Sequence, residues 1–216
     1  MSYIYLLGKP CSGKGTIASY MKYEYGFSHF RASKILFQHI NEVHGENSEI
    51  MQSILNGSHI VTGDEYNHVF LKSLKQINNN NIVFDGYPRE LDQLNFLVNH
   101  HHPADRKRFL IILEIEDEDV FERYVKRVIC KSCDREQTHN SESRCIYCNE
   151  ISLFKRHDDQ LDAIKNRINT YNTIIKSFKN FDYEKYNLAI HVIKVDNFSK
   201  TSEIAQNIFY IVKEMN

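Results

Sequence analysis

Short, mostly apolar runs alternate along this chain with longer segments in which apolar residues recur every three or four positions. The runs are typical of strands buried on both faces of a parallel sheet, and the longer period is typical of amphipathic helices. Strands are predicted at residues 3–7, 27–30, 82–84, 109–115 and 190–195. Helices are predicted at residues 14–25, 33–44, 46–56, 63–77, 91–99, 117–128, 158–178 and 201–214. This alternation indicates an α/β fold with a doubly wound, five-stranded parallel sheet.

The first predicted strand leads directly into a glycine-rich loop. Residues 8–16 fit G-x-x-x-x-G-K up to Lys14, with Gly15-Thr16 in place of an immediate Ser or Thr, and a predicted helix follows. Backbone N–H groups of such a loop converge on an anion, and the helix N-terminus adds partial positive charge. The pattern therefore predicts a P-loop in which Lys14 reaches the β- and γ-phosphates of a nucleotide. A glycine turn without a ligand is the alternative.

Length and charge narrow the class of protein. At 216 residues the chain can bury a full core, so one domain with insertions is expected. Its formal net charge of −1 gives no strong field to favour nucleic acid or a membrane surface. No apolar run is long enough to span a bilayer, and residues 1–4 do not begin a signal peptide. These features predict a cytoplasmic protein with no nucleic-acid or membrane partner.

Four of the five cysteines form two pairs, Cys130-x-x-Cys133 and Cys145-x-x-Cys148. In a reducing compartment this spacing indicates a metal more often than disulfides, and four thiolates make a closed, structural Zn²⁺ site. Residues 134–144 are too polar to supply a core of their own, so a metal would hold the segment together. Idle thiols are one alternative. An RNA-binding zinc ribbon is the other, with the basic residues Lys126, Arg127, Lys131 and Arg135.

Five segments, in order, resemble the adenylate kinase family of nucleoside monophosphate kinases over nearly the whole chain. The loop at 8–16 is similar to the family's G-x-P-G-x-G-K-G-T, and Arg123-x-x-x-Arg127 to its R-x-x-x-R at the entrance of a mobile lid. The two cysteine pairs match the zinc-bearing lid of the longer bacterial members. The other two motifs are Asp85-Gly86-Tyr87-Pro88-Arg89 with Gln93, and Arg156-His157-Asp158-Asp159 with Arg167 and Tyr171.

The resemblance implies three parts and one reaction. The parts are a core (residues 1–31, 62–126 and 160–216), a helical acceptor-binding insertion (32–61) and a zinc-bearing lid (127–159). The implied reaction is ATP + AMP ⇌ 2 ADP, with Mg²⁺ on the ATP, in a monomer. Because phosphoryl transfer asks a protein chiefly for positioning and charge stabilisation, the family's arginines suit this chemistry.

The resemblance also implies roles for individual residues. ATP would be held by Pro10, Cys11, Ser12, Gly13, Lys14, Gly15, Thr16, Arg123 and Arg127. AMP would be held by Ala32, Lys34, Phe37, Val61, Gly86, Arg89, Gln93, Arg156 and Arg167. Catalysis would rest on Lys14, Arg89, Arg123, Arg127, Arg156, Arg167, Asp158 and Asp159, with Asp85 holding the water shell of Mg²⁺. Surface arginines paired with nearby acids, and a solvated acidic helix start at 158–159, are the alternatives.

Three departures from the family pattern bear on function. Cys11 replaces a glycine in the loop, and it is either an inert packed thiol or a redox-sensitive one. Ala32 stands where the family has a threonine against the acceptor adenine, and Phe37 where it has an arginine for the acceptor phosphate. Lys34 or the nearby Arg31 would compensate. The third departure is a set of extra residues at 57–65. A kinase for another nucleoside monophosphate, or a non-catalytic nucleotide-binding regulator, therefore stays open.

Overall fold

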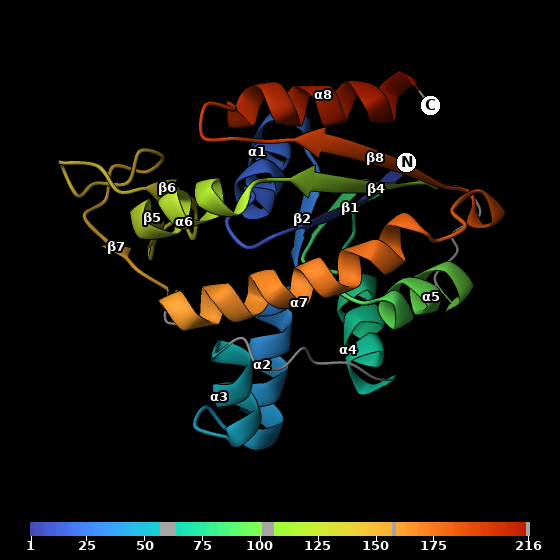
Figure 1. Ribbon diagram of the computed structural model, residues 1–216, viewed down its shortest axis with the longest axis horizontal. Helices are drawn as coiled ribbons and strands as arrows, with labels where there is room; N and C mark the ends of the chain where they lie inside the picture. Colours follow the sequence, from blue (N-terminus) through green and yellow to red (C-terminus); the bar gives the residue numbers. More distant parts are fainter. Residues whose placement is uncertain (57–63, 101–105, 157–158, 215–216) are drawn as a thin grey trace.

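The computed structural model describes residues 1–56, 64–100, 106–156 and 159–214, and a five-stranded parallel sheet lies at its centre (Figure 1). Each neighbouring pair of strands in this sheet is parallel, in the order β2-β3-β1-β4-β8. The predicted α/β fold with a five-stranded parallel sheet is therefore confirmed. The strands are β1 (Ser2–Gly8), β2 (Ser28–Arg31), β3 (Ile82–Asp85), β4 (Lys107–Glu114) and β8 (Leu188–Lys194).

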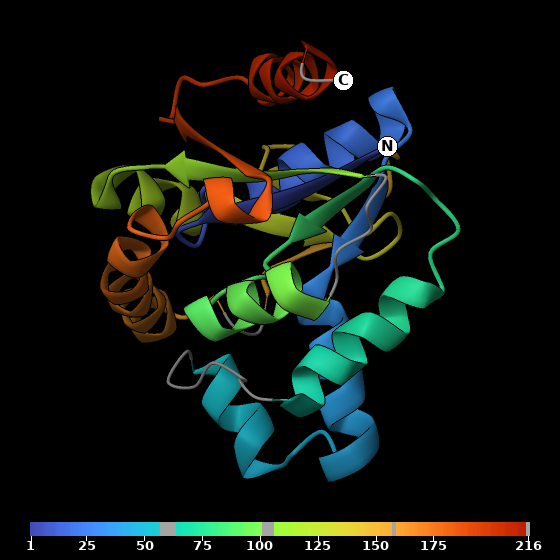
Figure 2. The ribbon, with the colours of Figure 1, turned by 90° about the vertical axis from the view of Figure 1, so that its right-hand side faces the viewer.

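Helices cover both faces of this sheet (Figure 2). None of the described helices has the length and apolar character needed to cross a bilayer. A short 3₁₀ helix at Glu184–Tyr186 precedes β8. The α-helices are α1 (Lys14–Tyr25), α2 (Ala32–His44), α3 (Glu49–Leu55), α4 (Asp64–Lys75), α5 (Leu91–His100), α6 (Asp117–Lys126), α7 (Leu161–Lys179) and α8 (Thr201–Glu214).

Alternate residues of β1 pack into two different apolar clusters. Tyr3 and Tyr5 belong to a cluster with side chains of α4, α5 and α7, whereas Ile4 and Leu6 belong to a cluster with side chains of α1 and α8. Successive strand residues point to opposite faces, so a sheet covered on both faces requires an unbroken apolar run. The two layers fix the carboxyl ends of β1 and β3, where the glycine-rich loop and residues 85–89 begin.

Two insertions extend from this core. Helices α2 and α3 lie below the sheet in Figure 1, and the cysteine-bearing segment lies at its left end. This segment contains a small antiparallel sheet of β5 (Arg127–Cys130), β6 (Glu136–Thr138) and β7 (Leu153–Phe154), in the order β6-β5-β7. The sequence did not predict these strands. The boundaries proposed for core, acceptor-binding insertion and lid stay a prediction.

Four predicted helices are too long at one end, and one of them, predicted to reach residue 77, ends at Lys75. The helix predicted to reach residue 128 ends at Lys126, because Arg127 has extended backbone (φ −70°, ψ 133°) and begins β5. The helix predicted from 158 begins at Leu161, after the extended residue Gln160. The helix predicted from 46 begins at Glu49, where the side chain of Ser48 accepts a hydrogen bond from the Met51 N–H at 3.2 Å. That bond is an N-cap, and it fixes the helix start.

Candidate active site

The glycine-rich loop curls around the ammonium group of Lys14. Lys14 Nζ donates hydrogen bonds to the carbonyl oxygens of Gly8 and Lys9, at 2.7 Å each, and to Ser12 Oγ at 3.2 Å. Gly13 caps the N-terminus of α1 in the left-handed region (φ 95°), which glycine adopts without steric cost. The loop therefore holds a fixed positive charge at the start of a helix, the arrangement that binds phosphate.

Cys11 also adopts a left-handed backbone conformation, with φ 59°. A side chain in this region is uncommon, and glycine would relieve the strain there. The thiol is buried, burial raises its pKa, and the residue lines the cavity beside the loop. Arg123 supports the same turn, because its Nη1 donates to the Cys11 carbonyl oxygen at 3.2 Å. The turn at Cys11 thus has an arginine bound to its backbone.

Asp85 ends β3 next to this loop. Burial alone would raise the pKa of Asp85, but His29, whose Nε2 lies 3.3 Å from Oδ2, and the charge of Lys14 lower it to about 2. The carboxylate is therefore ionised at neutral pH. Mg²⁺ prefers oxygen ligands and keeps several of its waters, so an ionised carboxylate at the edge of a phosphate loop fits the metal of a nucleotide.

A cavity of about 180 Å³ opens beside the loop. Its walls come from the loop, the end of β3 and helices α2, α3 and α7. The remaining wall comes from the cysteine-bearing segment, residues 127–156 and 159, which we call the lid segment. Cations dominate its polar lining, which suits a ligand with several phosphates. The cations are Lys14, Arg89, Arg127, Arg156 and Arg167. Because they come from four stretches that are separate in the sequence, they meet only in the folded protein.

The arginines are held by specific partners. Arg127 binds the Asp159 carboxylate through two nitrogens, with Nε 2.9 Å from Oδ2, and the Asp159 side chain is almost fully buried. Arg156 Nη1 lies 3.1 Å from Glu136 Oε1, and Arg167 Nη2 lies 3.4 Å from the Ile54 carbonyl oxygen. Paired guanidinium groups with fixed planes are pre-oriented for an incoming phosphate.

Of the residues predicted to bind the acceptor, some line the cavity and others do not. Phe37 and Gly86 line the cavity, with Leu36 and Ile54 beside Phe37. A methyl group added to Gly86 (φ 83°) would lie 2.9 Å from Arg89 Nη2, so the close approach of Arg89 requires glycine. Arg89 Nε donates to the Gly86 carbonyl oxygen at 2.8 Å. Arg89 is thus held against the backbone of Gly86 at the cavity wall, and its predicted role in binding the acceptor stays a prediction.

Several predicted residues lie outside the cavity lining. Ala32 is fully buried, and its carbonyl oxygen accepts a hydrogen bond from Tyr66. Gln93 is also buried, and its Oε1 accepts a hydrogen bond from the Arg89 N–H at 2.7 Å. The residues Ser12, Thr16, Lys34, Arg123 and Asp159 do not line the cavity either. Val61 and Asp158 lie outside the described residues.

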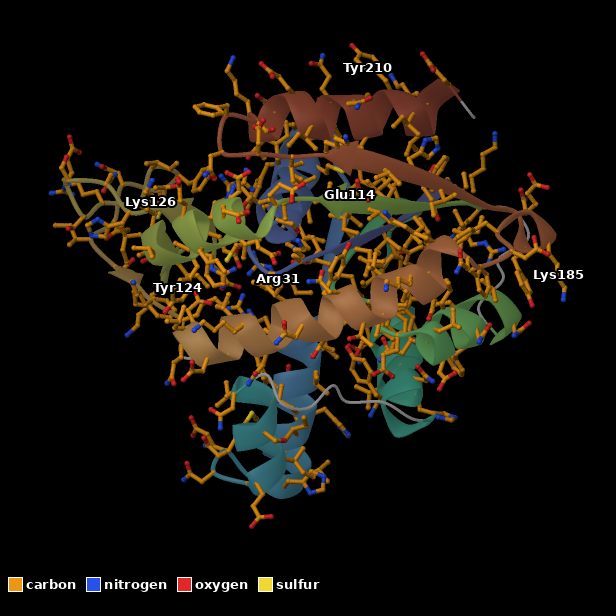
Figure 3. All side chains as sticks on the ribbon, viewed as in Figure 1. Arg31, Glu114, Tyr124, Lys126, Lys185 and Tyr210 are labelled. Atoms are coloured by element: carbon orange, nitrogen blue, oxygen red, sulfur yellow. The ribbon has the colours of Figure 1, made fainter. Side chains whose placement is uncertain are left out.

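Lys34 and Arg31 bind the lid segment. Asp134 Oδ2 lies 2.6 Å from Arg31 Nη1 and 3.1 Å from Lys34 Nζ, and its carbonyl oxygen accepts a further bond from Arg31 at 2.7 Å. Arg31, labelled in Figure 3, ends β2, and Lys34 lies in the first turn of α2. Both cations therefore join β2 and α2 to the lid segment. In this conformation the charges expected to compensate for Phe37 are already paired.

Arg135, the next residue of the lid segment, packs against α1. Its guanidinium carbon lies 3.4 Å from the ring centre of Tyr23 and 4.5 Å from that of Tyr147. A guanidinium group stacked on aromatic rings is favourable electrostatically. Two of the four basic residues of the alternative RNA-binding ribbon, Arg127 and Arg135, are therefore engaged inside the molecule.

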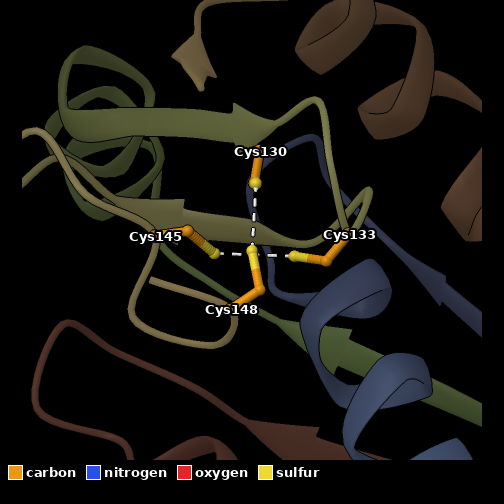
Figure 4. A group of neighbouring side chains, drawn as sticks. All are labelled: Cys130, Cys133, Cys145 and Cys148. Carbon is orange, nitrogen blue, oxygen red and sulfur yellow. Dashed lines mark hydrogen bonds between the residues drawn. The ribbon is translucent and has the colours of Figure 1, made fainter. Parts of the chain in front are cut away.

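The four paired cysteines converge on one point (Figure 4). Their sulfur atoms all lie within 4.8 Å of one another, with Cys130–Cys148 at 3.6 Å and Cys133–Cys145 at 3.5 Å. A tetrahedral Zn²⁺ with Zn–S bonds of about 2.3 Å separates its sulfurs by ~3.8 Å. The donor set and its size therefore fit a structural zinc ion, as predicted.

The two cysteine pairs are held by equivalent turns. The N–H of Asp134 donates to the Cys130 carbonyl oxygen, and that of Asn149 to the Cys145 carbonyl oxygen, at 2.9 Å each. Asp134 and Asn149 both have left-handed backbones, with φ 58° and 63°. Asn and Asp tolerate this region better than most residues. The polar segment thus carries the local chemistry needed to present two thiols per turn.

Glu136 is a residue of the cavity that the sequence did not reveal. It lies on β6, three residues after Cys133, and its carboxylate contacts Arg156 and lines the cavity beside the glycine-rich loop. A single glutamate in a polar, charged segment gives no pattern to distinguish it. Only the pairing of β6 with β5, which turns this side chain toward the loop, identifies it.

This arrangement is that of a P-loop phosphotransferase: a parallel sheet with a glycine-rich loop after its first strand, and four arginines that line one cavity with the lysine of that loop. Comparison with known proteins narrows the class. The family model for adenylate kinase matches residues 6–187, and the chain belongs to the adenylate kinase family. It is a nucleoside monophosphate kinase that transfers a phosphoryl group between ATP and AMP and uses Mg²⁺ with ATP.

Curated relatives support this membership along most of the chain. The chain is 30% identical over 196 residues to the adenylate kinase of Mycoplasmoides gallisepticum, covering 87% of this chain and 88% of that protein. It is 28% identical over 198 residues to that of Elusimicrobium minutum, covering 84% and 88%. It is 28% identical over 218 residues to that of Mycoplasma capricolum subsp. capricolum, covering 97% of each.

Proposed function

We propose that the cavity beside the glycine-rich loop is where the γ-phosphoryl group of Mg-ATP passes reversibly to AMP, with the donor on the loop and the acceptor opposite Arg89. The observation that carries this assignment is the convergence of five cations from separate stretches of chain on one cavity. In-line transfer needs donor and acceptor held close together, with charge stabilised and water excluded. No covalent intermediate is required.

Each group has a distinct part in this proposal. Lys14 neutralises charge on the β- and γ-phosphates, while Arg127, oriented by Asp159, and Arg156 act on the transferring group. Arg123 binds the backbone of the loop, so we assign it a positioning role. Asp85 would hold waters of the magnesium ion, which supplies charge neutralisation on the phosphates.

The identity of the acceptor base is the part of the proposal that experiment can test most directly. Phe37, Leu36 and Ile54 make the acceptor wall apolar, and Arg89 faces it as the cation for a phosphate. AMP is the proposed acceptor because of the family. A different nucleoside monophosphate is the second candidate, favoured by Phe37 in the wall and by the burial of Ala32 and Gln93 away from it.

We further propose that the chain acts as a monomer in the cytoplasm, without nucleic-acid or membrane partners. A reducing compartment suits its free cysteines, four of which converge as thiol ligands. The proposed parts are the core, the acceptor-binding insertion at 32–61 and the lid at 127–159. A lid closed over the cavity, as in the arrangement here, would place Arg127 and Arg156 on the phosphates.

The decisive experiment measures ADP formed from Mg-ATP with AMP, CMP, UMP, GMP and dTMP offered separately. We expect turnover with AMP to exceed that with the other four. Preference for a different acceptor would replace AMP within the same reaction. ATP binding without turnover on any acceptor would overturn the proposal in favour of a non-catalytic nucleotide-binding regulator.

The affinity for ATP should fall as the pH rises above about 8. Burial within the loop lowers the pKa of Lys14 to about 8, although the Asp85 carboxylate opposes that shift. Phosphate favours the ammonium form, so above this pH binding must take up a proton, and affinity should fall up to about tenfold per pH unit. Below it, Lys14 is already charged and the slope should vanish.

Calorimetric titration of ATP between pH 7 and 9.5, in two buffers with different ionisation enthalpies, measures this proton uptake directly. Lys14→Ala should remove both the slope and the uptake. Wild-type affinity that stays constant through pH 9.5 would contradict the assignment of Lys14 to the phosphates.

Removing the charge of Asp134 should weaken the closed arrangement of the lid segment. Asp134→Asn keeps a residue that tolerates φ 58° but loses the ion pairs with Arg31 and Lys34. Partly exposed pairs contribute about 0.2–1 kcal/mol each, so loss of both should raise the KM for ATP about twofold to at most about thirtyfold. Steady-state kinetics at low and high salt measure the effect, since salt should narrow the difference. Glu150→Gln, an exposed change in the same segment, is the matched control.

A further inference from the structure

Two carboxylates flank Gly15 of the glycine-rich loop. A methyl group placed on Gly15 would lie 3.2 Å from Asp85 Oδ2 and 3.4 Å from Glu136 Oε2. Asp85 belongs to the core, at the end of β3, whereas Glu136 belongs to β6 of the lid segment. The carboxylate from the lid segment therefore reaches the same edge of the loop as the carboxylate assigned to the metal of ATP.

Glu136 differs from the other charged groups of the cavity. Among the described residues that line it, Asp85 and Glu136 are the acids, against five cations. Glu136 is about one-fifth exposed, and its known partner is Arg156 at 3.1 Å. A carboxylate is unexpected in a cavity that binds phosphates, because it repels the phosphates that the cations attract.

A metal ion on the nucleotide reverses that repulsion. The triphosphate of ATP without a metal would place its negative charge against Glu136. With Mg²⁺ on the β- and γ-phosphates, the same carboxylate would face a cation and its waters. The sign of the interaction thus depends on whether the donor carries its metal.

We propose that Glu136 is a specificity-determining residue that makes the phosphate site select metal-bound ATP over metal-free ATP. The inference rests on the proposed function, because it takes the loop as the site of the donor's phosphates. With the lid segment placed as it is here, Glu136 and Asp85 would together face the metal of a donor bound at the loop. Selection of the metal-loaded donor then depends on the lid segment in this position.

The test is equilibrium binding of ATP and of Mg-ATP to the wild type and to Glu136→Gln, by calorimetry on the full chain. Metal-free conditions come from buffer passed over a chelating resin, with no soluble chelator, so that zinc on the cysteines is undisturbed. We expect the wild type to prefer Mg-ATP by about tenfold or more, and Glu136→Gln to lose most of that preference by gaining affinity for metal-free ATP.

Two further variants sharpen the result. Glu136→Asp keeps the charge and should keep part of the preference, while Glu142→Gln, an exposed glutamate of the same segment, should keep all of it. An unchanged preference in Glu136→Gln overturns the inference. So does an equal loss of affinity for both forms of ATP, which would leave Glu136 as a partner of Arg156 alone.

Turnover with AMP, measured on the same preparations, separates this inference from the proposed function. A wild type that binds ATP but phosphorylates no acceptor overturns the proposed function, whatever Glu136→Gln does to the metal preference. An active Glu136→Gln with unchanged preference overturns only the inference.

Discussion

Replacing Lys14 by alanine is expected to lower kcat/KM by about 10³-fold or more while the chain stays folded. Lys14 is the cation that the glycine-rich loop encloses, with hydrogen bonds to Gly8, Lys9 and Ser12. Without it, the phosphates lose a positive charge fixed inside a low-dielectric site, where charge interactions are strong. The loss should fall on the affinity for ATP, because the ammonium already binds phosphate in the ground state, and on kcat, because charge develops on the transferring group during reaction.

The control for this variant lies on the same helix. Lys22→Ala removes an exposed lysine in the last turn of α1 and should leave turnover unchanged. Circular dichroism and thermal melting should show that Lys14→Ala retains the wild-type fold. Burying the ammonium is itself unfavourable, as its lowered pKa shows, so its removal need not destabilise the chain. A folded Lys14→Ala enzyme within about tenfold of wild-type activity would remove Lys14 from the mechanism.

Lys14→Arg is the stricter variant. It keeps the charge but replaces a compact ammonium with a planar guanidinium, which cannot fit the ring of acceptors formed by the loop. We expect it to resemble Lys14→Ala in kcat. Recovery of activity in Lys14→Arg would mean that charge alone, and not the enclosed geometry, is what the loop supplies.

The parts of the fold that could be predicted are those with a strong local pattern. The apolar run at 109–115 marks β4 because a strand covered on both faces has no polar side. The loop at 8–16 and the two cysteine pairs combine rare residues at fixed spacing. Such patterns can be recognised in a sequence without knowing what packs against them.

The parts that could not be predicted depend on contacts between distant segments. Strands of two to four residues, such as β6 and β7, are too short to show a period. The sequence also gives no sign that Asp134 binds Arg31, since the two lie far apart in the chain. Gln93 satisfies a backbone N–H instead of facing the cavity, which only the turn at Arg89 decides.

The structure also changes how one departure is understood. Phe37 stands where the family has an arginine, and Lys34 and Arg31 were the expected substitutes. Both are bound to Asp134 of the lid segment, so the cationic charge of this region serves the contact between parts of the chain. We therefore propose that binding of the acceptor phosphate depends more heavily on Arg89 here than the family pattern implies.

Loss of zinc is the second large effect we expect. Purified protein should contain one zinc ion per chain, and its removal should unfold the lid segment. Within that segment the side chains of Ile146, Tyr147 and Ile151 are exposed, so apolar burial contributes little. Structural zinc sites in small peptides contribute about 10–16 kcal/mol of binding free energy, and this binding is what folds them.

Unfolding of the lid segment should also destabilise the rest of the molecule. Arg127 and Glu136 lie on its strands, and Arg135 packs on Tyr23 of α1, so these contacts disappear with it. If the docked segment contributes about 3 kcal/mol to the folded chain, the melting temperature should fall on the order of 10 °C. Turnover should fall as well, because two of the cavity's cations, Arg127 and Arg156, lose their partners.

Metal analysis, thermal melting and limited proteolysis test this on the wild type before and after chelation, and on Cys133→Ser and Cys148→Ser. The matched control is Cys11→Ser, which lies outside the cluster and should keep its zinc. New cleavage should be confined to the lid segment, while the five-stranded sheet stays protected. A chain that purifies without metal, melts at the same temperature after chelation and resists cleavage there would show that the four thiols hold nothing, and that β5, β6 and β7 stabilise the lid segment by themselves.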